Sequence, residues 1–573
     1  MIAGSGSHSG KTTVACGLLE AFRKRGLSVG AYKTGPDYID PQFLRRSGKC
    51  EAYNLDTWLM SAERTLELFA GTSAGKDIAV VEGAMGLYDG GLHSTAGIAK
   101  LLKAPVILVM DAKSLGESGA AIALGFREYD PDVNFAGVIL NRTGSSYHER
   151  IIADELARLG IKCFGGLRRD DGLGVGERHL GLVPADEGAG YDSERLRRAV
   201  EEGIALDEVL RISEGGSDFS AHPLTLKHSA QTQETPDFSA HPLTLKHSAQ
   251  TQETPDFSAL PLTVKHSAQT QEATDFSAHP LTVKHSAQTQ EATNFPAHPL
   301  TLKHSAQTQE ATNFPAHPLT LKLSEQTQEA TDFPAHPLTL KLSEQTQEAT
   351  DFPAHPLTVK HSAQTQRVRI GVARDDAFSF YYPESLAVLE AMGAELEYFS
   401  PIHDKCLPKA DGYIFGGGFP EMFADELSAN ASMLESVRTN TKPVLAECGG
   451  YMYLCRSLRD FEGRPHKMAG VIPADAVMTN KPILGYMEAE TLRSNILCVR
   501  GRVIRGHEFH YSRIEADFPE GLCAFGMRRR NTDTLRIGGY ADRNILASYL
   551  HINLWGNPEL AERFINALTL SKV

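Results

Sequence analysis

Short apolar runs alternate with helically spaced segments along the first third of the chain. Three of these runs are continuous in apolar residues, which is typical of strands buried on both faces of a parallel sheet: Ile78–Val81, Val106–Val109 and Ala136–Leu140. Segments between them, such as Ser61–Ala70, have the spacing of amphipathic helices. The alternation predicts a doubly wound α/β domain over residues 1–213. Because its first strand begins with only Met1–Ala3, we expect the true start to lie a few residues upstream.

The same alternation returns in the last third of the chain. Strand-like runs occupy Val368–Ala373, Ala394–Phe399 and Gly412–Phe415, and Tyr382–Met392 has the pattern of a helix. Residues 367–573 are therefore predicted to form a second α/β domain.

Residues 214–366 repeat a 19-residue unit, whose phenylalanines fall at 219, 238, 257, 276, 295, 314, 333 and 352. A solenoid is one interpretation of such a repeat. Each unit has few large apolar residues, at least one proline and a half rich in Ser, Gln and Thr, so burial cannot offset the entropy lost on ordering. We therefore favour a disordered or loosely extended linker without a catalytic role. Closure entropy grows slowly with linker length, so the flanking domains could still dock.

Length, charge and cysteine content exclude several classes of function. The 573 residues exceed a single core, and the formal net charge of −14 argues against a nucleic-acid partner, which would need a basic face. The eight cysteines show no paired spacing, so we expect neither disulfides nor zinc. The longest apolar run, Ala104–Met110, is too short to cross a membrane, and no leader-peptide pattern is visible. We expect a cytoplasmic protein that binds neither membranes nor nucleic acid.

A glycine-rich loop opens the chain as Gly4-Ser5-Gly6-Ser7-His8-Ser9-Gly10-Lys11-Thr12-Thr13. Its small residues let backbone N–H groups face a phosphate at a helix N-terminus. Lys11 would reach the β- and γ-phosphates of ATP, and the Thr12 hydroxyl would meet Mg²⁺. Ser5 stands where the strict motif has glycine. A plain turn is the alternative, but the loop lies between a strand and an apolar helix, so we predict nucleotide binding by Gly10, Lys11, Thr12 and Thr13.

Carboxylates are the next requirement, because Mg²⁺ prefers oxygen ligands. Asp37 and Asp40 lie between Pro36 and Pro41, where turn chemistry is an equally good interpretation. Glu82 follows a predicted strand, at the end where open α/β sheets bind ligands. We take Thr12, Asp37 and Glu82 as candidate metal ligands.

A thiol on a tight turn marks the second domain. Cys448 lies between the predicted strand Pro443–Ala446 and the apolar segment Tyr451–Leu454, and two glycines follow it. This context permits an exposed sulfur with backbone N–H donors around it, to which Gly416–Gly418 could add. His551 could act as its base. The alternative is a buried structural cysteine, which is our interpretation of Cys455, Cys498 and Cys523.

The two sites together predict an enzyme that hydrolyses an amide at one place and uses ATP at another, as glutamine-dependent amide ligases do. These residues resemble the cobyrinate a,c-diamide synthase family. The resemblance rests on the phosphate loop, Cys448, His551 and four further segments: Gly35–Pro41, Glu82–Gly90, Glu177–Pro184 and Gly506–Ser512. It covers both predicted domains and leaves out the repeat.

The resemblance implies ATP-dependent amidation of the a and c carboxylates of cobyrinate, with L-glutamine as nitrogen donor and Mg²⁺ as cofactor. It implies that four carboxylates serve ATP, magnesium and the substrate: Asp37, Asp40, Glu82 and Asp89. It also implies a class I glutaminase-like domain in which Cys448 is the nucleophile and His551 raises its nucleophilicity. A homodimer is a further possibility that we keep open.

Two features depart from the family pattern. Glutaminase triads often have an acid two residues after the histidine, but Asn553 stands there, so we expect no acid behind His551. The long repeat is the second departure. Other substrates also stay open, namely nickel sirohydrochlorin and hydrogenobyrinate. A switch ATPase of the chromosome- or septum-positioning type would carry a lysine where Gly6 stands and would lack the thiol domain. An inactive enzyme, with its domains held apart by the repeat, is a last alternative.

Overall fold

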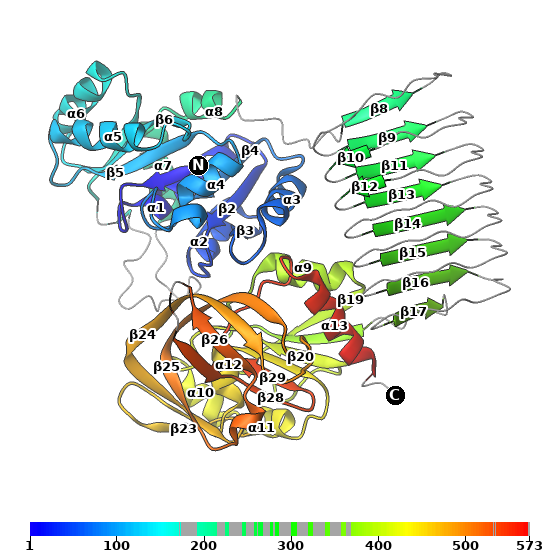
Figure 1. Ribbon diagram of the computed structural model, residues 1–573. Helices are drawn as coiled ribbons and strands as arrows, with labels where there is room; N and C mark the ends of the chain where they lie inside the picture. The colour runs from blue at the N-terminus through cyan, green and yellow to red at the C-terminus, as the bar shows by residue number, and fades with distance from the viewer. Residues whose placement is uncertain are drawn as a thin grey trace. The chain divides into compact units, whose positions relative to one another are not determined.

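The computed structural model describes residues 1–170, 172–173, 192–214, the short strands β8–β17 of the repeat, 368–530, 532 and 534–570. The chain divides into two compact units (Figure 1). One unit comprises Met1–Asp218 and Arg367–Val573, and the other is Phe219–Gln366. No helix among the described residues is long and apolar enough to cross a membrane.

The N-terminal half of the first unit is a seven-stranded sheet in the order β3-β2-β4-β1-β5-β6-β7, parallel throughout. Its strands are β1 Ile2–Gly4, β2 Val29–Thr34, β3 Ala52–Leu55, β4 Ile78–Glu82, β5 Val106–Asp111, β6 Phe135–Thr143 and β7 Cys163–Arg168. The three predicted strands correspond to β4, β5 and β6. The short β1 lies at the centre, with Ile2 opposite both Glu82 and Ile107. The predicted α/β fold class is confirmed.

Helices flank this sheet: α1 Lys11–Lys24, α2 Asp40–Gly48, α3 Ala62–Ser73, α4 Thr95–Leu101, α5 Ser118–Tyr129, α6 Ser146–Arg158, α7 Ser193–Gly203 and α8 Leu206–Glu214, with a 3₁₀ turn at Gly91–His93. The predicted helix from Ser61 is α3, and the Ser61 hydroxyl caps it by accepting the Arg64 N–H at 3.2 Å. The apolar face of α1 is buried with residues such as Leu18 and Phe22. This packing holds the start of α1 over the end of β1, where the phosphate loop lies.

The C-terminal half contains a second sheet in the order β19-β18-β20-β21-β29-β28. Its strands are β18 Val368–Ala373, β19 Ala394–Phe399, β20 Gly412–Phe415, β21 Val444–Glu447, β28 Tyr540–Asp542 and β29 Ile545–Ser548. Its helices are α9 Pro383–Ala391, α10 Ala424–Ala429, α11 Ala431–Arg438, α12 Gly449–Leu454 and α13 Pro558–Leu570. The strands and the helix predicted after residue 366 are all present.

A further sheet follows that the sequence patterns did not predict. Its strands are β22 Ser457–Arg459, β23 Pro465–Lys467, β24 Ala474–Thr491, β25 Val503–Ala516, β26 Phe525–Arg529 and β27 Leu535–Gly538, and a 3₁₀ turn lies at Glu520–Leu522. The long strands β24 and β25 pair antiparallel, and buried and exposed residues alternate along them. This sheet brings Gly506–Ser512 beside the thiol site described below.

The two halves of the first unit contact each other through hydrogen bonds and a ring stack. The Tyr486 hydroxyl donates to Asp56 at 2.8 Å. Arg64 Nη2 donates to the Trp555 carbonyl at 2.8 Å, and the Trp555 indole donates back to the Arg64 carbonyl at 2.9 Å. The Tyr38 ring stacks on Phe380 with 5.3 Å between centroids.

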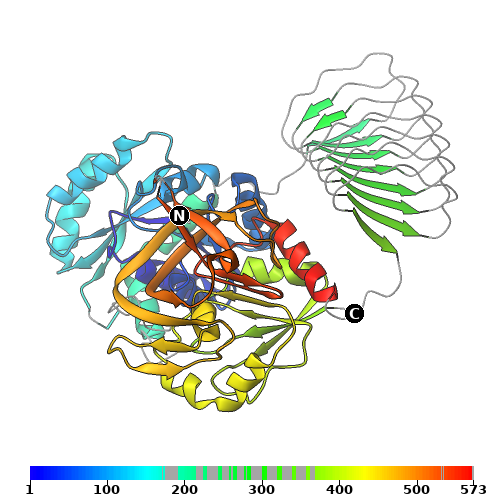
Figure 2. The ribbon, with the colours of Figure 1, turned by 60° about the horizontal axis from the view of Figure 1, so that its bottom comes forward.

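The repeat forms short parallel strands in its described residues: β8 Leu224–His228, β9 Leu243–His247, β10 Phe257–Ala259, β11 Leu262–His266, β12 Phe276–Ala278, β13 Leu281–His285, β14 Leu300–Ser305, β15 Leu319–Ser324, β16 Leu338–Ser343 and β17 Leu357–His361. Equivalent positions pair, as Leu224 with Leu243, so one repeat makes one rung (Figure 2). These segments follow the solenoid alternative, because identical units allow identical backbone pairing. The rest of each repeat lies outside the described residues, and our expectation for the whole insert stays a prediction.

Candidate functional site

The phosphate loop runs from the end of β1 into α1. Gly10 caps the helix with φ +94°, and a Cβ there would lie 1.9 Å from Asn141 Nδ2. That amide donates to the Ser9 carbonyl at 3.0 Å, so it holds the loop where only glycine fits at position 10. The Ser9 hydroxyl is buried and has no hydrogen-bond partner among the described residues. The loop therefore carries a buried donor that a bound anion would satisfy.

Lys11, Thr12 and Thr13 form the first turn of α1. Lys11 Nζ donates to the Gly6 carbonyl at 3.0 Å, and burial together with the charge of Lys33 lowers the pKa of Lys11. The Thr12 hydroxyl donates to Glu82 Oε1 at 2.6 Å. Thr13 is half-buried. The sequence predicted that the helix starts at Val14, and the structure begins it three residues earlier, at Lys11.

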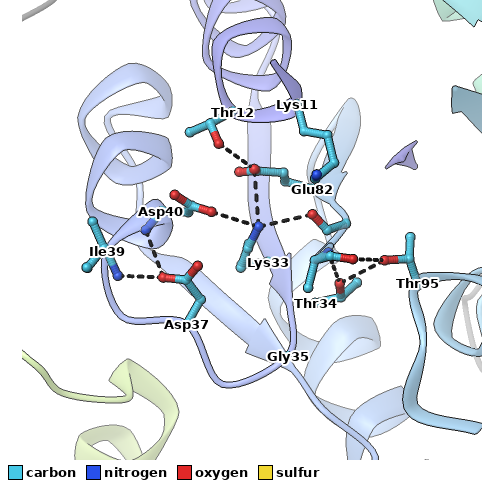
Figure 3. Close-up of polar contacts among 12 residues, drawn as sticks. Lys11, Thr12, Lys33, Thr34, Gly35, Asp37, Ile39, Asp40, Glu82 and Thr95 are labelled. Atoms are coloured by element: carbon cyan, nitrogen blue, oxygen red, sulfur yellow. Dashed lines mark hydrogen bonds and ion pairs between the residues drawn. The ribbon is translucent and has the colours of Figure 1, made fainter. Parts of the chain in front are cut away.

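Lys33, which the sequence analysis missed, is the central cation of this site (Figure 3). Its ammonium lies 2.9 Å from Asp40 and 3.1 Å from Glu82, and it donates to the Gly83 carbonyl at 3.0 Å. Burial alone would lower the pKa of Lys33, but the charges of Asp40 and Glu82 raise it above its ordinary value. A lysine directly after the apolar run Val29–Tyr32 was the available signal. Lys33 joins β2, the start of α2 and the end of β4.

Glu82 is fully buried at the carboxyl end of β4. Burial raises its pKa to about 7 although the positive charge of Lys33 lowers it. Its Oε2 has no hydrogen-bond partner among the described residues, whereas Oε1 accepts from Thr12. Thr12 Oγ1 and Glu82 Oε1 are therefore adjacent, and Glu82 Oε2 is available to a ligand.

The other predicted carboxylates take distinct positions. Asp37 Oδ1 accepts the N–H groups of Ile39 at 2.8 Å and Asp40 at 3.1 Å, which is the turn chemistry considered as an alternative (Figure 3). Asp89 Oδ2 accepts the Gly86 N–H at 2.8 Å. The charges of Glu82, Asp40 and Asp89 act against the burial that lowers the pKa of Lys11, so the fold gathers these carboxylates around the loop.

The donor set suits Mg²⁺ in part. Thr12 and Glu82 offer adjacent oxygen atoms, which a hard cation prefers. Within the described ranges, no group of three or more His, Cys, Asp and Glu residues could hold a metal by itself. A metal here would complete its coordination with phosphate and water oxygens, as is usual for Mg²⁺. The role of Asp37 as a ligand stays a prediction.

Cys448 lies on the sharp turn between β21 and α12, as predicted. Its backbone has φ +48° and ψ −100°, which is uncommon for a residue with a side chain. A Cβ at Gly450 would lie 2.2 Å from the Phe415 carbonyl, and the Gly450 N–H donates to the Gly416 carbonyl at 2.9 Å. The turn thus packs directly on the end of β20, beside the predicted Gly416–Gly418 segment.

The thiol is buried, so the expectation of an exposed sulfur is wrong, and its surroundings favour the protonated form. The exposed fraction of Cys448 is 4%, and its Sγ donates to the Phe509 carbonyl at 3.7 Å. Burial and the carboxylates of Glu421, Glu447 and Glu508 raise the pKa of the Cys448 thiol. In the described part of the chain, Cys448 Sγ forms its hydrogen bond with the Phe509 carbonyl and not with His551. A base is therefore needed to generate a thiolate.

His551 lies just beyond β29 and is 1% exposed. Its backbone pairs with His507 through hydrogen bonds of 2.8 and 3.1 Å. Its Nδ1 lies 3.4 Å from Glu447 Oε2. The expectation that no acid stands behind His551 is therefore wrong, because an acid comes from the adjacent strand β21 and not from the position after the histidine.

The Gly506–Ser512 segment lies on β25. Burial lowers the pKa of His507 and of His510 to about 3, so both imidazoles are neutral near pH 7. The His510 ring stacks on Tyr549 with 3.6 Å between centroids, and buried Glu508 pairs with Arg536. These contacts build the wall beside Cys448. The Glu177–Pro184 segment lies outside the described residues.

Comparison with known proteins identifies two domains. Residues 1–182 match the CobQ/CobB/MinD/ParA nucleotide binding domain, and residues 369–559 match the CobB/CobQ-like glutamine amidotransferase domain. Among solved structures, chloroplast FtsY from Physcomitrella patens shares 20% identity, covering 35% of this chain and 64% of its own, with a TM-score of 0.24, which is too low to inform the fold.

Curated relatives cover nearly the whole chain. The cobyrinate a,c-diamide synthase of Dehalococcoides mccartyi strain CBDB1 is 34% identical, covering 99% of this chain and 97% of its own. That of Caldanaerobacter subterraneus subsp. tengcongensis is 32% identical with the same coverage. The hydrogenobyrinate a,c-diamide synthase of Streptomyces coelicolor is 34% identical over 99% of this chain and 96% of its own. The chain therefore belongs to the cobyrinate a,c-diamide synthase family of glutamine-dependent ligases, which confirms the resemblance.

Proposed function

We propose that this member of the family uses ATP and glutamine to amidate the a and c carboxylates of cobyrinate. The observation that carries the proposal is one compact unit holding both a phosphate loop with buried carboxylates and a strained cysteine with a buried histidine. The 34% identity to a cobyrinate a,c-diamide synthase over 99% of the chain supports this substrate.

The N-terminal half would activate the substrate carboxylate. A carboxylate is a poor acyl donor, because its leaving group would be oxide, and transfer of the ATP γ-phosphate to its oxygen gives an acyl phosphate that ammonia can attack. The loop amides and Lys11 would hold the phosphates. Thr12 and Glu82 would hold Mg²⁺, which when bound neutralises charge on the phosphate oxygens. Lys33 would hold Asp40 and Glu82 in place through its ion pairs with both carboxylates. Asp37 and Asp89 are assigned to the same site.

The C-terminal half would supply ammonia. His551 would accept the Cys448 proton, and the thiolate would attack the side-chain carbonyl of glutamine. The carbon–nitrogen bond then breaks, and His551 returns the proton to the departing ammonia. Water hydrolyses the thioester to glutamate and restores the thiol. Backbone N–H groups near Gly416–Gly418 and Gly449 would stabilise the oxyanion.

Hydrogenobyrinate is a second candidate substrate, which the Streptomyces coelicolor relative favours. The two differ by a cobalt ion that the substrate carries. The test is incubation of the full chain with ATP, Mg²⁺, glutamine and one of three tetrapyrroles: cobyrinate, hydrogenobyrinate or nickel sirohydrochlorin. Mass spectrometry should show a two-step amidation of cobyrinate at the highest kcat/KM. Preference for either other tetrapyrrole would reassign the substrate. A cytoplasmic location and a homodimer stay predictions.

A further inference from the structure

Asn553 stands where glutaminase triads often carry their acid, and its side chain is engaged elsewhere. It is fully buried, its Nδ2 donates to Glu384 Oε1 at 2.8 Å, and its Oδ1 accepts the Gly556 N–H at 2.9 Å. These bonds fix the segment after the histidine against α9. Asn553 therefore has a packing role and no negative charge to offer His551.

Glu447 approaches the histidine from the neighbouring strand. β21 and β29 pair in parallel with Glu447 opposite Ser548, three residues before His551. Glu447 Oε1 accepts the Ile552 N–H at 3.2 Å, and Oε2 lies 3.4 Å from His551 Nδ1. One carboxylate thus contacts both the backbone after the histidine and its ring. The side chains are 15% and 1% exposed, so solvent screens the interaction weakly.

The other groups around His551 make different contacts. Tyr38 contributes its ring, with 4.9 Å between centroids. His507 pairs through its backbone and is neutral, because burial lowers its pKa to about 3. Glu508 pairs with Arg536, which balances its charge. Among the described residues, Glu447 is the carboxylate directed at Nδ1.

We infer that Glu447 is the positioning residue of His551, an inference that rests on the proposed glutaminase function. His551 Nδ1 makes no hydrogen bond among the described residues, so an Nδ1–H that closes the 3.4 Å gap to this carboxylate would fix the tautomer whose Nε2 can accept a proton. When the Cys448 proton moves to Nε2, the nearby Glu447 carboxylate would stabilise the imidazolium. The 3.4 Å separation is long for a hydrogen bond, as is common for catalytic contacts in free enzymes. The residue before the nucleophile thus replaces the acid missing after the base.

The test compares full-length variants in glutamine-dependent and ammonia-dependent amidation. Glu447→Gln keeps the size of the side chain and an oxygen for the Ile552 N–H, but it removes the charge. We expect its glutamine-dependent kcat to fall about 10²–10⁴-fold while its ammonia-dependent kcat stays at the wild-type value. The acid limb of its glutamine-dependent pH profile should move to lower pH, because the imidazolium loses its partner. Glu447→Asp should recover part of kcat, and the exposed Glu426→Gln should match wild type.

The outcomes separate this inference from the proposed function. If Cys448→Ala abolishes glutamine use but Glu447→Gln keeps the wild-type kcat and pH profile, the role of Glu447 is wrong and the glutaminase site stands. If Glu447→Gln lowers both activities equally, its role is general packing, and the inference also fails. If Cys448→Ala still uses glutamine, the proposed function itself fails. Should Glu447→Gln not fold, an Asp variant no better than Glu447→Ala would overturn the inference.

Discussion

The ring of Tyr38 lies against the ring of His551, with 4.9 Å between their centroids. Tyr38 stands between Asp37 and Asp40, and Asp40 pairs with Lys33 in the phosphate site. One short segment therefore belongs to the phosphate site and also contacts the histidine of the thiol site. This contact is why we propose that ammonia release and carboxylate activation are successive steps of one reaction and not two independent activities.

Lys11→Ala should abolish synthesis with glutamine and with ammonia alike, because both need the activated carboxylate. We expect a loss of about 10³-fold or more in kcat, since the lysine would stabilise charge on the transferring phosphate. The measurement is product formation with each nitrogen donor. Normal ammonia-dependent synthesis in this variant would exclude phosphate activation at the loop.

Cys448→Ala should lose glutamine-dependent amidation by about 10⁴-fold or more, because no other group forms the thioester. Free ammonia needs no thiolate to attack an acyl phosphate, so synthesis at high ammonium concentration should continue. Cys455→Ala, on the buried end of α12, is the matched control and should use both donors. Retention of glutamine use by Cys448→Ala would contradict the class I glutaminase assignment.

Deletion of residues 219–366, with a short polar linker in their place, should preserve both activities. The reason is that every residue assigned to the two sites lies in the other compact unit. The measurement is kcat/KM with glutamine and with ammonia, together with the melting temperature. Loss of folding, or slow amide hydrogen exchange across the whole repeat in the intact chain, would show that the insert is structural.

Glu384→Gln should change how stability depends on pH. Burial raises the pKa of Glu384 from 4.5 to about 7, so the folded state binds a proton more tightly than the unfolded state. Between pH 4.5 and 7 the free energy of unfolding therefore falls as pH rises, by up to about 3 kcal/mol for this group. The substituted amide cannot titrate, so the variant should lose that part of the slope. If the free energies of unfolding of wild type and Glu384→Gln, measured by chemical denaturation, change with pH in the same way, the raised pKa of Glu384 is refuted.

Local motifs made much of this protein predictable from its sequence. The phosphate loop and the turn at Cys448 each depend on a few consecutive residues whose backbone geometry the glycines reveal. The role of Lys33 could not be predicted because its partners Asp40 and Glu82 come from other elements of the fold. The contact of Glu447 with His551 could not be predicted for the same reason, because it joins positions 104 residues apart on neighbouring strands.

The antiparallel sheet was missed for a different reason. Continuous apolar runs mark strands buried on both faces, whereas strands with one exposed face lack such runs. Along β24, buried and partly exposed residues alternate, as in a strand with one solvent-facing side. In the described strands of the repeat, equivalent residues of neighbouring copies pair in register, and the composition of one copy does not reveal such pairing.

The central claim is that glutamine nitrogen reaches two carboxylates of cobyrinate in an ATP-dependent reaction. The most direct measurement is incubation of the full chain with cobyrinate, ATP, Mg²⁺ and glutamine labelled with ¹⁵N at its side-chain amide, followed by mass spectrometry of the tetrapyrrole. The account predicts one and then two labelled amides, and none when ATP is omitted. An unmodified tetrapyrrole in the complete reaction, or amidation that proceeds without ATP, would contradict it.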